Sequence, residues 1–326
     1  MIYLGVDGGG TKTAFTLINH NGHIIAHTRK KGTNLLHITK KKFKNTLIEG
    51  ISEVCNKINK NINDIDYSFL GIPCYGEDKE RDKIIRNIIK ECLINNNYTI
   101  GNDVEAGWAG SLACQPGINI VAGTGSIGFG KNEEGKKLRS GGWGWFSSDE
   151  GSAYWLGKKL INLYTKQIDN RLEKTLLYEV IKNEYNLKSD IDFISLVNKK
   201  ICHQRAMVAD LAKLLYKSAK EGDKYALIVF DEAAKELSMI VKSLISNLDF
   251  KNKKIPVSYS GGVFKAEELI LKPFRKYLSG NNIKIIAPIL KPVTGAALYA
   301  FELSNNPNNL EEVVSILKRQ ERNLFL

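Results

Sequence analysis

The chain carries the same short pattern twice, once near its start and once near its middle. In each copy an apolar strand runs into a turn of glycine and threonine, and further strands follow as a hairpin. The first copy covers residues 1–28, with Asn21-Gly22 as a hairpin turn, and the second covers residues 118–140. Two copies in 326 residues predict an α/β protein with two domains of one design.

Helical periodicity dominates after the second copy and predicts helices over residues 150–164, 205–220 and 224–248. We expect an N-terminal domain over residues 1–115, with Pro116-Gly117 as the crossing to a C-terminal domain over residues 116–304. The segment 305–326 begins with a linker-like Asn-rich stretch. It continues as an amphipathic helix that we expect to return to the first domain.

Composition narrows the classes of partner. The net charge is +12, but the lysines are scattered and no basic run is interleaved with aromatic residues, so nucleic acid is not an expected partner. A positive surface would still attract an anionic nucleotide. No apolar run approaches the roughly 20 residues needed to span a bilayer, and we expect a cytoplasmic protein that does not bind membranes. Five scattered cysteines without a CxxC pair argue against a disulfide framework or a zinc site.

The first glycine turn is suited to phosphate. It reads Asp7-Gly8-Gly9-Gly10-Thr11-Lys12-Thr13. Glycines let backbone N–H groups converge on phosphate oxygens, and the Thr11 or Thr13 hydroxyl and the Lys12 ammonium are further donors. Asp7 cannot donate to a phosphate, so we expect it to hold Mg²⁺. A tight turn capped by an Asp is the alternative interpretation.

The second glycine turn precedes a loop with aromatic and acidic residues. The turn reads Gly123-Thr124-Gly125-Ser126, and the loop contains Gly141-Gly142-Trp143-Gly144 and Ser148-Asp149-Glu150-Gly151-Ser152. We interpret the turn as phosphate-binding and the loop as sugar-binding, because tryptophan offers a face and the carboxylate an acceptor for a polar ring. The spacing also fits the dinucleotide fingerprint GxGxxG, but a hairpin follows where that fingerprint requires a helix.

Three further stretches lie at turns that follow predicted strands. Asp103 follows Asn102 at the start of a helix, where it can be an N-cap, a general base, or both, because a helix N-terminus favours an ionised carboxylate. Asn34 follows Thr33 in a loop and could bond a sugar hydroxyl or serve as a turn residue. Ser260-Gly261-Gly262 permits close approach by adenine or its ribose.

Taken in order, these motifs resemble the actin-type ATPase superfamily of sugar kinases and heat-shock ATPases. Within it, the sequence resembles N-acetylglucosamine kinases of the family shared with the activator ATPases of benzoyl-CoA reductase and 2-hydroxyglutaryl-CoA dehydratase. The matching motifs run from Asp7 to Gly262. The resemblance implies two ribonuclease-H-like domains with ATP and an amino sugar in the cleft between them.

The resemblance also implies roles for individual residues. Asp103 matches the catalytic base, and Asp7 is the expected Mg²⁺ ligand. The residues expected at ATP are Gly8, Gly9, Gly10, Thr11, Lys12, Thr13, Gly123, Thr124, Gly261 and Gly262. The residues expected at the sugar are Thr33, Asn34, Asp103, Gly125, Ser126, Gly142, Trp143, Gly144 and Asp149. Two stretches depart from some relatives, Pro73-Cys74-Tyr75-Gly76 and Trp145-Phe146-Ser147-Ser148, and both could alter which substituent at C2 or O3 of the sugar is admitted.

The implied reaction is transfer of the γ-phosphoryl group of ATP, with Mg²⁺, to the 6-hydroxyl of N-acetylglucosamine or a close amino sugar. A glucosamine or N-acetylmuramic acid kinase would use the same apparatus. An activator ATPase remains a different class of function, but its iron–sulfur cluster needs clustered cysteines. A sugar-responsive transcription regulator would need an added DNA-binding domain, for which Asp7 leaves no room at the N-terminus. A homodimer is compatible with the resemblance, although no sequence feature identifies an interface.

Overall fold

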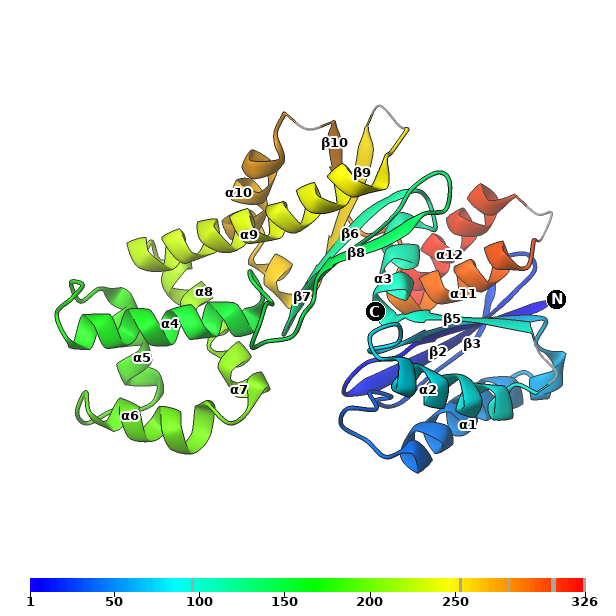
Figure 1. Ribbon diagram of the computed structural model, residues 1–326, viewed down its shortest axis with the longest axis horizontal. Coiled ribbons are helices and arrows are strands. Elements are labelled where there is room, and N and C mark those ends of the chain that lie inside the picture. Colours follow the sequence, from blue (N-terminus) through cyan, green and yellow to red (C-terminus); the bar gives the residue numbers. More distant parts are fainter. Residues whose placement is uncertain (95–96, 252–253, 281, 306–308, 325–326) are drawn as a thin grey trace. The chain divides into compact units, whose positions relative to one another are not determined.

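The computed structural model describes residues 1–94, 97–251, 254–280, 282–305 and 309–324 (Figure 1). The chain divides into two compact units. Unit 1 comprises Met1–Asn119 and Ala287–Leu326, and unit 2 comprises Ile120–Ile286. Each unit is built on a five-stranded sheet that contains both parallel and antiparallel strand pairs.

The sheet of unit 1 has the strand order β3-β2-β1-β4-β5. β1 pairs antiparallel with β2 and parallel with β4, and β4 pairs parallel with β5. The strands are β1 Ile2–Asp7, β2 Lys12–Asn19, β3 Ile24–Lys31, β4 Tyr67–Ile72 and β5 Asn97–Asn102. The helices are α1 Lys40–Asn56, the 3₁₀ turn η1 Ile62–Asp64, α2 Lys79–Cys92, α3 Asp103–Leu112, α11 Pro292–Leu303 and α12 Leu310–Leu324.

Helices cover both faces of this sheet, which explains why β1 is apolar on both sides. Leu4 and Val6 of β1 lie in the core with residues of α1 and α2. The alternate residue Tyr3 packs edge to face on Phe301 of α11, with ring centroids 5.2 Å apart. Figure 1 shows α1 and α2 on one face and α3 and α11 on the other.

The observed division of the chain differs from the predicted boundaries at two places. The units divide between Asn119 and Ile120, inside β6, and residues 287–304 belong to unit 1, whereas we expected them in the C-terminal domain. The reason is the small-residue face of α11. A Cβ added at Gly295 would lie 2.0 Å from the backbone N of Gly110 in α3. The two helix backbones therefore touch, and α11 is fixed to unit 1.

The C-terminal segment also lies in unit 1. Gln320 of α12 accepts the backbone N–H of Ile24, the first residue of β3 (2.8 Å). Glu321 accepts the backbone N–H of Lys291, just before α11 (3.0 and 3.1 Å). Of the predicted Asn-rich linker, residues 306–308 lie outside the described residues, as do residues 325–326 of the predicted helix.

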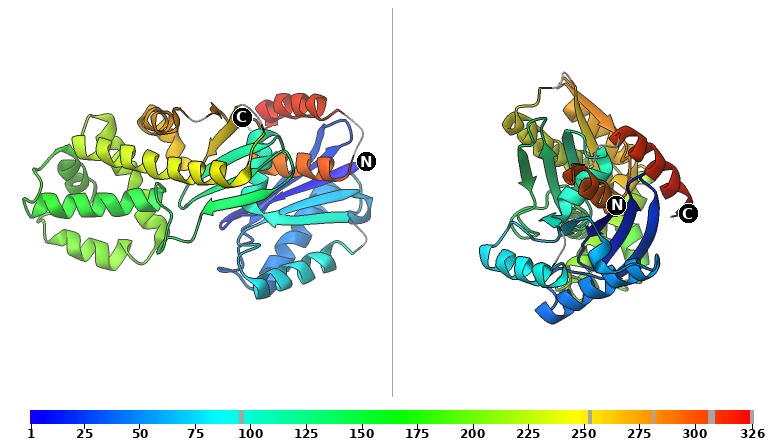
Figure 2. Two further views of the ribbon diagram at one scale, coloured as in Figure 1. Left: turned by 45° about the horizontal axis from the view of Figure 1, so that its top comes forward. Right: turned by 90° about the vertical axis from the view of Figure 1, so that its right-hand side faces the viewer.

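The sheet of unit 2 has the strand order β10-β9-β6-β7-β8, with β9 and β10 parallel and β7 and β8 antiparallel. The strands are β6 Gly117–Ala122, β7 Ser126–Lys131, β8 Lys137–Gly141, β9 Ile255–Ser260 and β10 Ile283–Ile286. The helical elements are α4 Ala153–Ile168, α5 Leu176–Glu184, α6 Asp192–Leu196, the π-helical turn η2 Val197–Ile201, α7 Arg205–Asp210, α8 Ala212–Lys220, α9 Lys224–Leu248, the 3₁₀ turn η3 Gly262–Ala266 and α10 Glu268–Leu278. The long α9 runs along β7 and β8, and α4 to α8 form a helical lobe of the unit (Figure 2).

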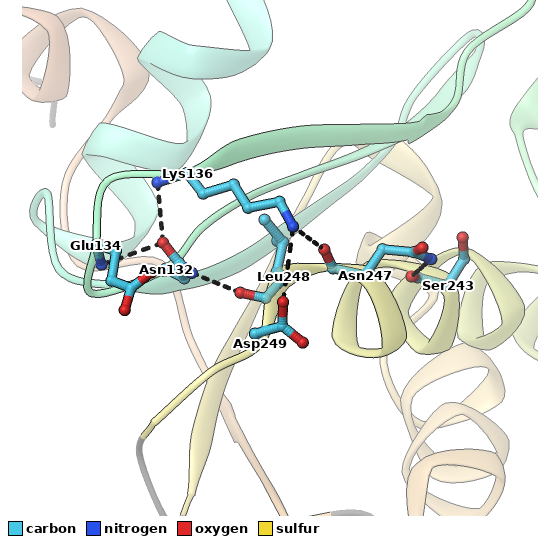
Figure 3. Close-up of polar contacts among 7 residues, drawn as sticks. All are labelled: Asn132, Glu134, Lys136, Ser243, Asn247, Leu248 and Asp249. Atoms are coloured by element: carbon cyan, nitrogen blue, oxygen red, sulfur yellow. Dashed lines mark hydrogen bonds and ion pairs between the residues drawn. The ribbon is translucent and has the colours of Figure 1, made fainter.

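The predicted hairpin at residues 126–141 is present, and its turn is attached to the end of α9 (Figure 3). Asn132 donates from Nδ2 to the Leu248 carbonyl (2.6 Å), while its Oδ1 accepts the Glu134 and Lys136 backbone N–H groups. The Lys136 ammonium donates to the Asn247 carbonyl (2.8 Å). A strand rather than a helix thus follows the second glycine turn, as the sequence predicted.

The helical lobe departs from the sequence prediction in its detail. The helix expected from Glu150 begins at Ala153, because the Ser152 hydroxyl caps it by accepting the Trp155 N–H. The helix expected over residues 205–220 is broken at Leu211 into α7 and α8. α5 and α6 were not predicted. Among the described residues, no helix has both the length and the apolar content needed to cross a bilayer.

Candidate active site

Parallel strands of unit 1 end side by side, and two carboxylates lie at these ends. The register pairs Asp7, the last residue of β1, with Gly71 of β4, and Gly71 with Gly101 of β5. α3 begins at Asp103, directly after β5, and a Cβ added at Gly71 would lie 3.4 Å from the Asp103 Cα. Ligands of open α/β sheets bind outside the carboxyl ends of the strands, so Asp7 and Asp103 lie where such a ligand is expected.

The surroundings of these two carboxylates make them harder to ionise. Burial and the negative charge of Asp103 raise the pKa of Asp7 to about 7, against the opposing effect of the Lys12 ammonium. Burial and the negative charge of Glu77 raise the pKa of Asp103 to about 6, against the backbone N–H groups of Val104 and Asp103 itself. Both residues keep part of their surface exposed, so they are recessed but accessible. A carboxylate whose pKa is close to the working pH suits proton transfer.

The first glycine turn lies next to Asp7. Gly8 donates its N–H to the Gly71 carbonyl (2.8 Å), and the Gly9 carbonyl accepts the Thr33 N–H (3.0 Å). Gly8 has no room for a side chain, because a Cβ there would lie 2.6 Å from the Thr33 hydroxyl and 2.8 Å from the Gly71 carbonyl oxygen. Gly10, Thr11 and Lys12 are exposed, so their N–H groups and the ammonium are placed at the surface as a phosphate site requires.

Two of the predicted ligand-binding residues in this region, Thr13 and Thr33, bond to each other. The Thr13 and Thr33 side chains are both fully buried, and their hydroxyl oxygens are 3.0 Å apart in a hydrogen bond. Neither hydroxyl reaches the surface. Both hydroxyls therefore support the glycine turn, and the predicted contacts of Thr13 with phosphate and of Thr33 with sugar stay predictions.

Asn34 lies next to these supports and is half-buried. Its Oδ1 accepts the Leu36 N–H (2.9 Å) and lies 3.9 Å from the Cys74 thiol, which donates to it. Its two amide N–H groups have no hydrogen-bond partner within the part of the chain that the structure describes. Asn34 is thus oriented through its oxygen and can still donate to a ligand.

The donor chemistry at Asp7 fits a hydrated divalent cation. In the described ranges no hydrogen bond reaches the Asp7 carboxylate, and a cation would offset both its burial and the repulsion from Asp103. No cluster of three or more His, Cys, Asp or Glu side chains that could enclose a metal is found among the described residues. Mg²⁺ typically binds one or two carboxylates and takes its other ligands from water and substrate phosphates, so Asp7 is sufficient as its protein ligand.

In unit 2, the second glycine turn is attached to the start of α4. The Gly123 carbonyl accepts the Ala153 N–H (2.8 Å), and the Thr124 carbonyl accepts the Tyr154 N–H (3.3 Å). The Ser126 hydroxyl donates to the Glu150 carbonyl (2.7 Å). The turn is therefore held at both ends, while the Thr124 side chain stays exposed.

A pocket of about 590 Å³ opens beside this turn, within unit 2. Its lining includes Gly123 and Thr124 from the turn, Ala206 from α7, and Gly262 and Val263 from η3. Gly261 directly precedes Gly262 and has φ of 101°, and a Cβ added at Gly261 would lie 2.3 Å from the Ala122 carbonyl oxygen. The structure thus brings the predicted phosphate turn and the predicted adenosine motif to one pocket, which is large enough for a small-molecule ligand.

The predicted sugar loop of unit 2 is exposed at its tip. Gly142 and Gly144 have φ of 70° and 92°, which requires glycine, and they flank Trp143. The aromatic side chains Trp143, Trp145 and Phe146 are 72%, 48% and 86% exposed. Exposed apolar side chains gathered in one loop are typical of a binding surface.

Asp149, at the base of this loop, is by contrast only 3% exposed. Its Oδ1 accepts the Ser126 N–H (3.2 Å), and its Oδ2 accepts a hydrogen bond from Arg205 Nη2 (2.5 Å). Sequence reasoning missed Arg205, and it also missed Glu77, which acts on Asp103. No local motif marks either residue, because their partners lie 56 and 26 positions away in the chain.

The predicted site residues therefore form one group in each unit. Unit 1 brings together the first glycine turn, Asn34 and Asp103, and unit 2 brings together the second glycine turn, Gly262 and Asp149. Each group contains a glycine turn with an exposed threonine and at least one polar side chain.

The sequence of the chain is similar to those of known proteins. A family model described as the BadF/BadG/BcrA/BcrD ATPase family matches residues 4–300. The N-acetylmuramic acid/N-acetylglucosamine kinase of Clostridium acetobutylicum is 32% identical over 300 residues, which cover 91% of this chain and 97% of that protein. The N-acetyl-D-glucosamine kinase of Dictyostelium discoideum is 31% identical over 313 residues, covering 92% and 97%.

Solved structures confirm the predicted fold class. A Chromobacterium violaceum protein provisionally classed as an N-acetylglucosamine kinase matches with a TM-score of 0.73 at 22% identity, covering 92% of this chain and 98% of that one. The ROK family glucokinase of Streptomyces griseus matches with a TM-score of 0.55 at 19% identity, covering 93% and 100%. The chain has the α/β fold of actin-type sugar kinases.

Proposed function

The chain belongs to the BadF/BadG/BcrA/BcrD ATPase family, and we propose that it transfers the γ-phosphoryl group of ATP to the 6-hydroxyl of N-acetylglucosamine or a close amino sugar. The observation that carries this proposal is the pair Asp7 and Asp103, at the carboxyl ends of β1 and β5 on either side of β4, beside an exposed glycine turn. The names of the two curated relatives, both amino-sugar kinases at 31–32% identity over nearly their whole length, support it.

Each unit by itself offers groups that would bind parts of ATP. From unit 1, the N–H groups of Gly9, Gly10 and Thr11 and the Lys12 ammonium would bond phosphate oxygens. From unit 2, the second glycine turn would contribute further N–H groups, and the pocket beside Gly262 has room for the adenosine. Asp7 would hold Mg²⁺, which when bound neutralises phosphate charge.

Proton transfer would fall to Asp103. Phosphoryl transfer asks a protein mainly for alignment and charge stabilisation, and a general base typically adds 10²–10⁴-fold. Asp103 suits this role because its carboxylate lies at the N-terminus of α3, which favours its ionised form, while burial keeps its pKa near 6. At neutral pH Asp103 is therefore ionised and can accept the proton of the acceptor hydroxyl.

Each unit by itself also offers candidate contacts for the acceptor sugar. Asn34 donates from its unpaired amide, Asp149 accepts from sugar hydroxyls, and Trp143 offers an exposed ring face. N-acetylmuramic acid is a second candidate acceptor, because the Clostridium acetobutylicum relative carries both sugars in its name. Glucosamine is a third.

ADP release from purified protein with ATP and Mg²⁺ would test the proposal. N-acetylglucosamine, N-acetylmuramic acid, glucosamine and glucose would be compared with a control without sugar, and the product would be examined by NMR for phosphorylation at the 6-hydroxyl. We expect sugar-dependent ADP release with at least one N-acetylated amino sugar. Equal ADP release with and without every sugar would refute the kinase assignment.

A further inference from the structure

An ion pair connects the predicted sugar loop to the helical lobe of unit 2. Arg205, the first residue of α7, donates from Nη2 to Asp149 Oδ2 at 2.5 Å. The Asp149 side chain is 4% exposed and the Arg205 side chain is 41% exposed. The acid is therefore buried beneath the guanidinium, and Arg205 is its one cationic partner among the described residues.

The pair is fixed in position from two sides. A Cβ added at Gly125 would lie 2.4 Å from Arg205 Nη2 and 2.8 Å from Asp149 Oδ2, so the pair rests directly on the second glycine turn. α7 itself is packed against α4, since a Cβ added at Gly157 would lie 1.9 Å from the Val208 carbonyl oxygen. Arg205 therefore has little freedom to leave Asp149.

The charge balance at Asp149 depends on this contact. Burial and the nearby Glu150 carboxylate raise the pKa of Asp149, whereas the Arg205 guanidinium and the Ser126 N–H lower it, with a net rise. An ionised carboxylate removed from water without a cation is strongly disfavoured, so losing Arg205 would favour the protonated acid. A protonated acid has lost part of its capacity to accept hydrogen bonds.

We propose that Arg205 is a positioning residue of the sugar site: it holds Asp149 in place and ionised, so that Asp149 can accept hydrogen bonds from sugar hydroxyls. The inference rests on the proposed kinase function, because the sugar is the ligand that Asp149 would contact. Arg205 itself would not contact the nucleotide, although the next residue, Ala206, lines the proposed nucleotide pocket.

The test is steady-state kinetics of Arg205→Met with N-acetylglucosamine and ATP varied separately. We expect the KM for the sugar to rise at least about tenfold, because breaking a buried ion pair is costly, and the KM for ATP to stay within about threefold. In the variant, the sugar KM should fall as the pH is raised and Asp149 ionises. Arg205→Lys should recover part of the sugar affinity.

The matched control is Arg171→Met, which removes an exposed Arg–Asp pair with Asp169 (2.7 Å) from the same unit. It should leave both KM values unchanged. An equal rise in both KM values of Arg205→Met, or a sugar KM without pH dependence, would overturn the positioning role.

A second measurement does not depend on the reaction. The Tm of Arg205→Met should fall further below that of wild type at pH 8 than at pH 5, because ionising Asp149 without its partner is unfavourable. If wild type releases no ADP with any sugar, the proposed function fails, and the Tm difference still decides whether Arg205 keeps Asp149 ionised. A Tm difference that is the same at both pH values would contradict that part of the inference.

Discussion

Replacing Asp7 by asparagine should stabilise the ligand-free protein at alkaline pH. The pKa of Asp7 rises from 3.8 to about 7 in the folded chain, mainly because of burial. Each pKa unit is worth about 1.4 kcal/mol, so the ionised Asp7 carboxylate lowers the free energy of unfolding by up to about 4 kcal/mol. Asparagine has nearly the same shape, carries no charge, and displaces no hydrogen bond seen among the described residues.

The sign of the pH dependence follows from the raised pKa. Well below pH 3.8 the folded and unfolded states both hold the proton, and Asp7 costs no stability. As the pH rises to about 7, the unfolded state releases its proton first, so wild-type stability falls relative to Asp7→Asn.

Urea unfolding of both proteins, followed by circular dichroism without nucleotide or Mg²⁺, would measure this. We expect the free energy of unfolding of the variant to exceed that of wild type by about 2–3 kcal/mol more at pH 8 than at pH 5. In a separate binding assay, the variant should bind ATP more weakly than wild type in the presence of Mg²⁺. Glu80→Gln is the control, because it neutralises an exposed carboxylate of the same unit. A stability difference that does not change with pH would refute the assignment of Asp7 as a carboxylate strained by burial.

Three other predictions concern catalysis and packing. Asp103→Asn should lower kcat at least about a hundredfold in a folded protein, and wild-type kcat should decline as the pH falls through about 6; near-normal turnover in the variant would remove Asp103 from the role. Gly295→Ala should lower the free energy of unfolding by at least about 2 kcal/mol in urea titrations, because its Cβ would overlap the backbone of Gly110. Glu321→Ala should cost about 1 kcal/mol in the same assay, because Glu321 accepts the backbone N–H of Lys291 directly before α11, while Glu321→Gln should cost less.

Elements with strong local signals could be predicted from the sequence alone. The long α9 has the predicted bounds, Lys224–Leu248, because an Asp caps its start and its apolar residues recur at helical spacing. The two glycine turns followed by strands were predicted from turn chemistry and apolar runs. Asp103 was expected at a strand end and a helix start, and it lies there because Asn102 caps α3.

Features that depend on a distant partner could not be predicted. Helical periodicity shows that α11 has a small-residue face, but it does not reveal that Gly110 of α3 is its partner. The hydroxyls of Thr13 and Thr33 look like ligand donors in the sequence, whereas burial turns them toward each other. Asp149 and Arg205 are 56 positions apart, so only the packing of α7 on α4 shows that they meet.

The hydrogen bonds between the second glycine turn and the start of α4 also bear on how this protein could be modified. They fasten Gly123 to Ala153 and Ser126 to Glu150, below the exposed tip formed by Trp143, Trp145 and Phe146. The loop tip can therefore change in length and aromatic content while the hydrogen bonds at the base of the loop stay intact. Grafting residues 142–147 from a kinase of different sugar preference should transfer selectivity without loss of nucleotide affinity.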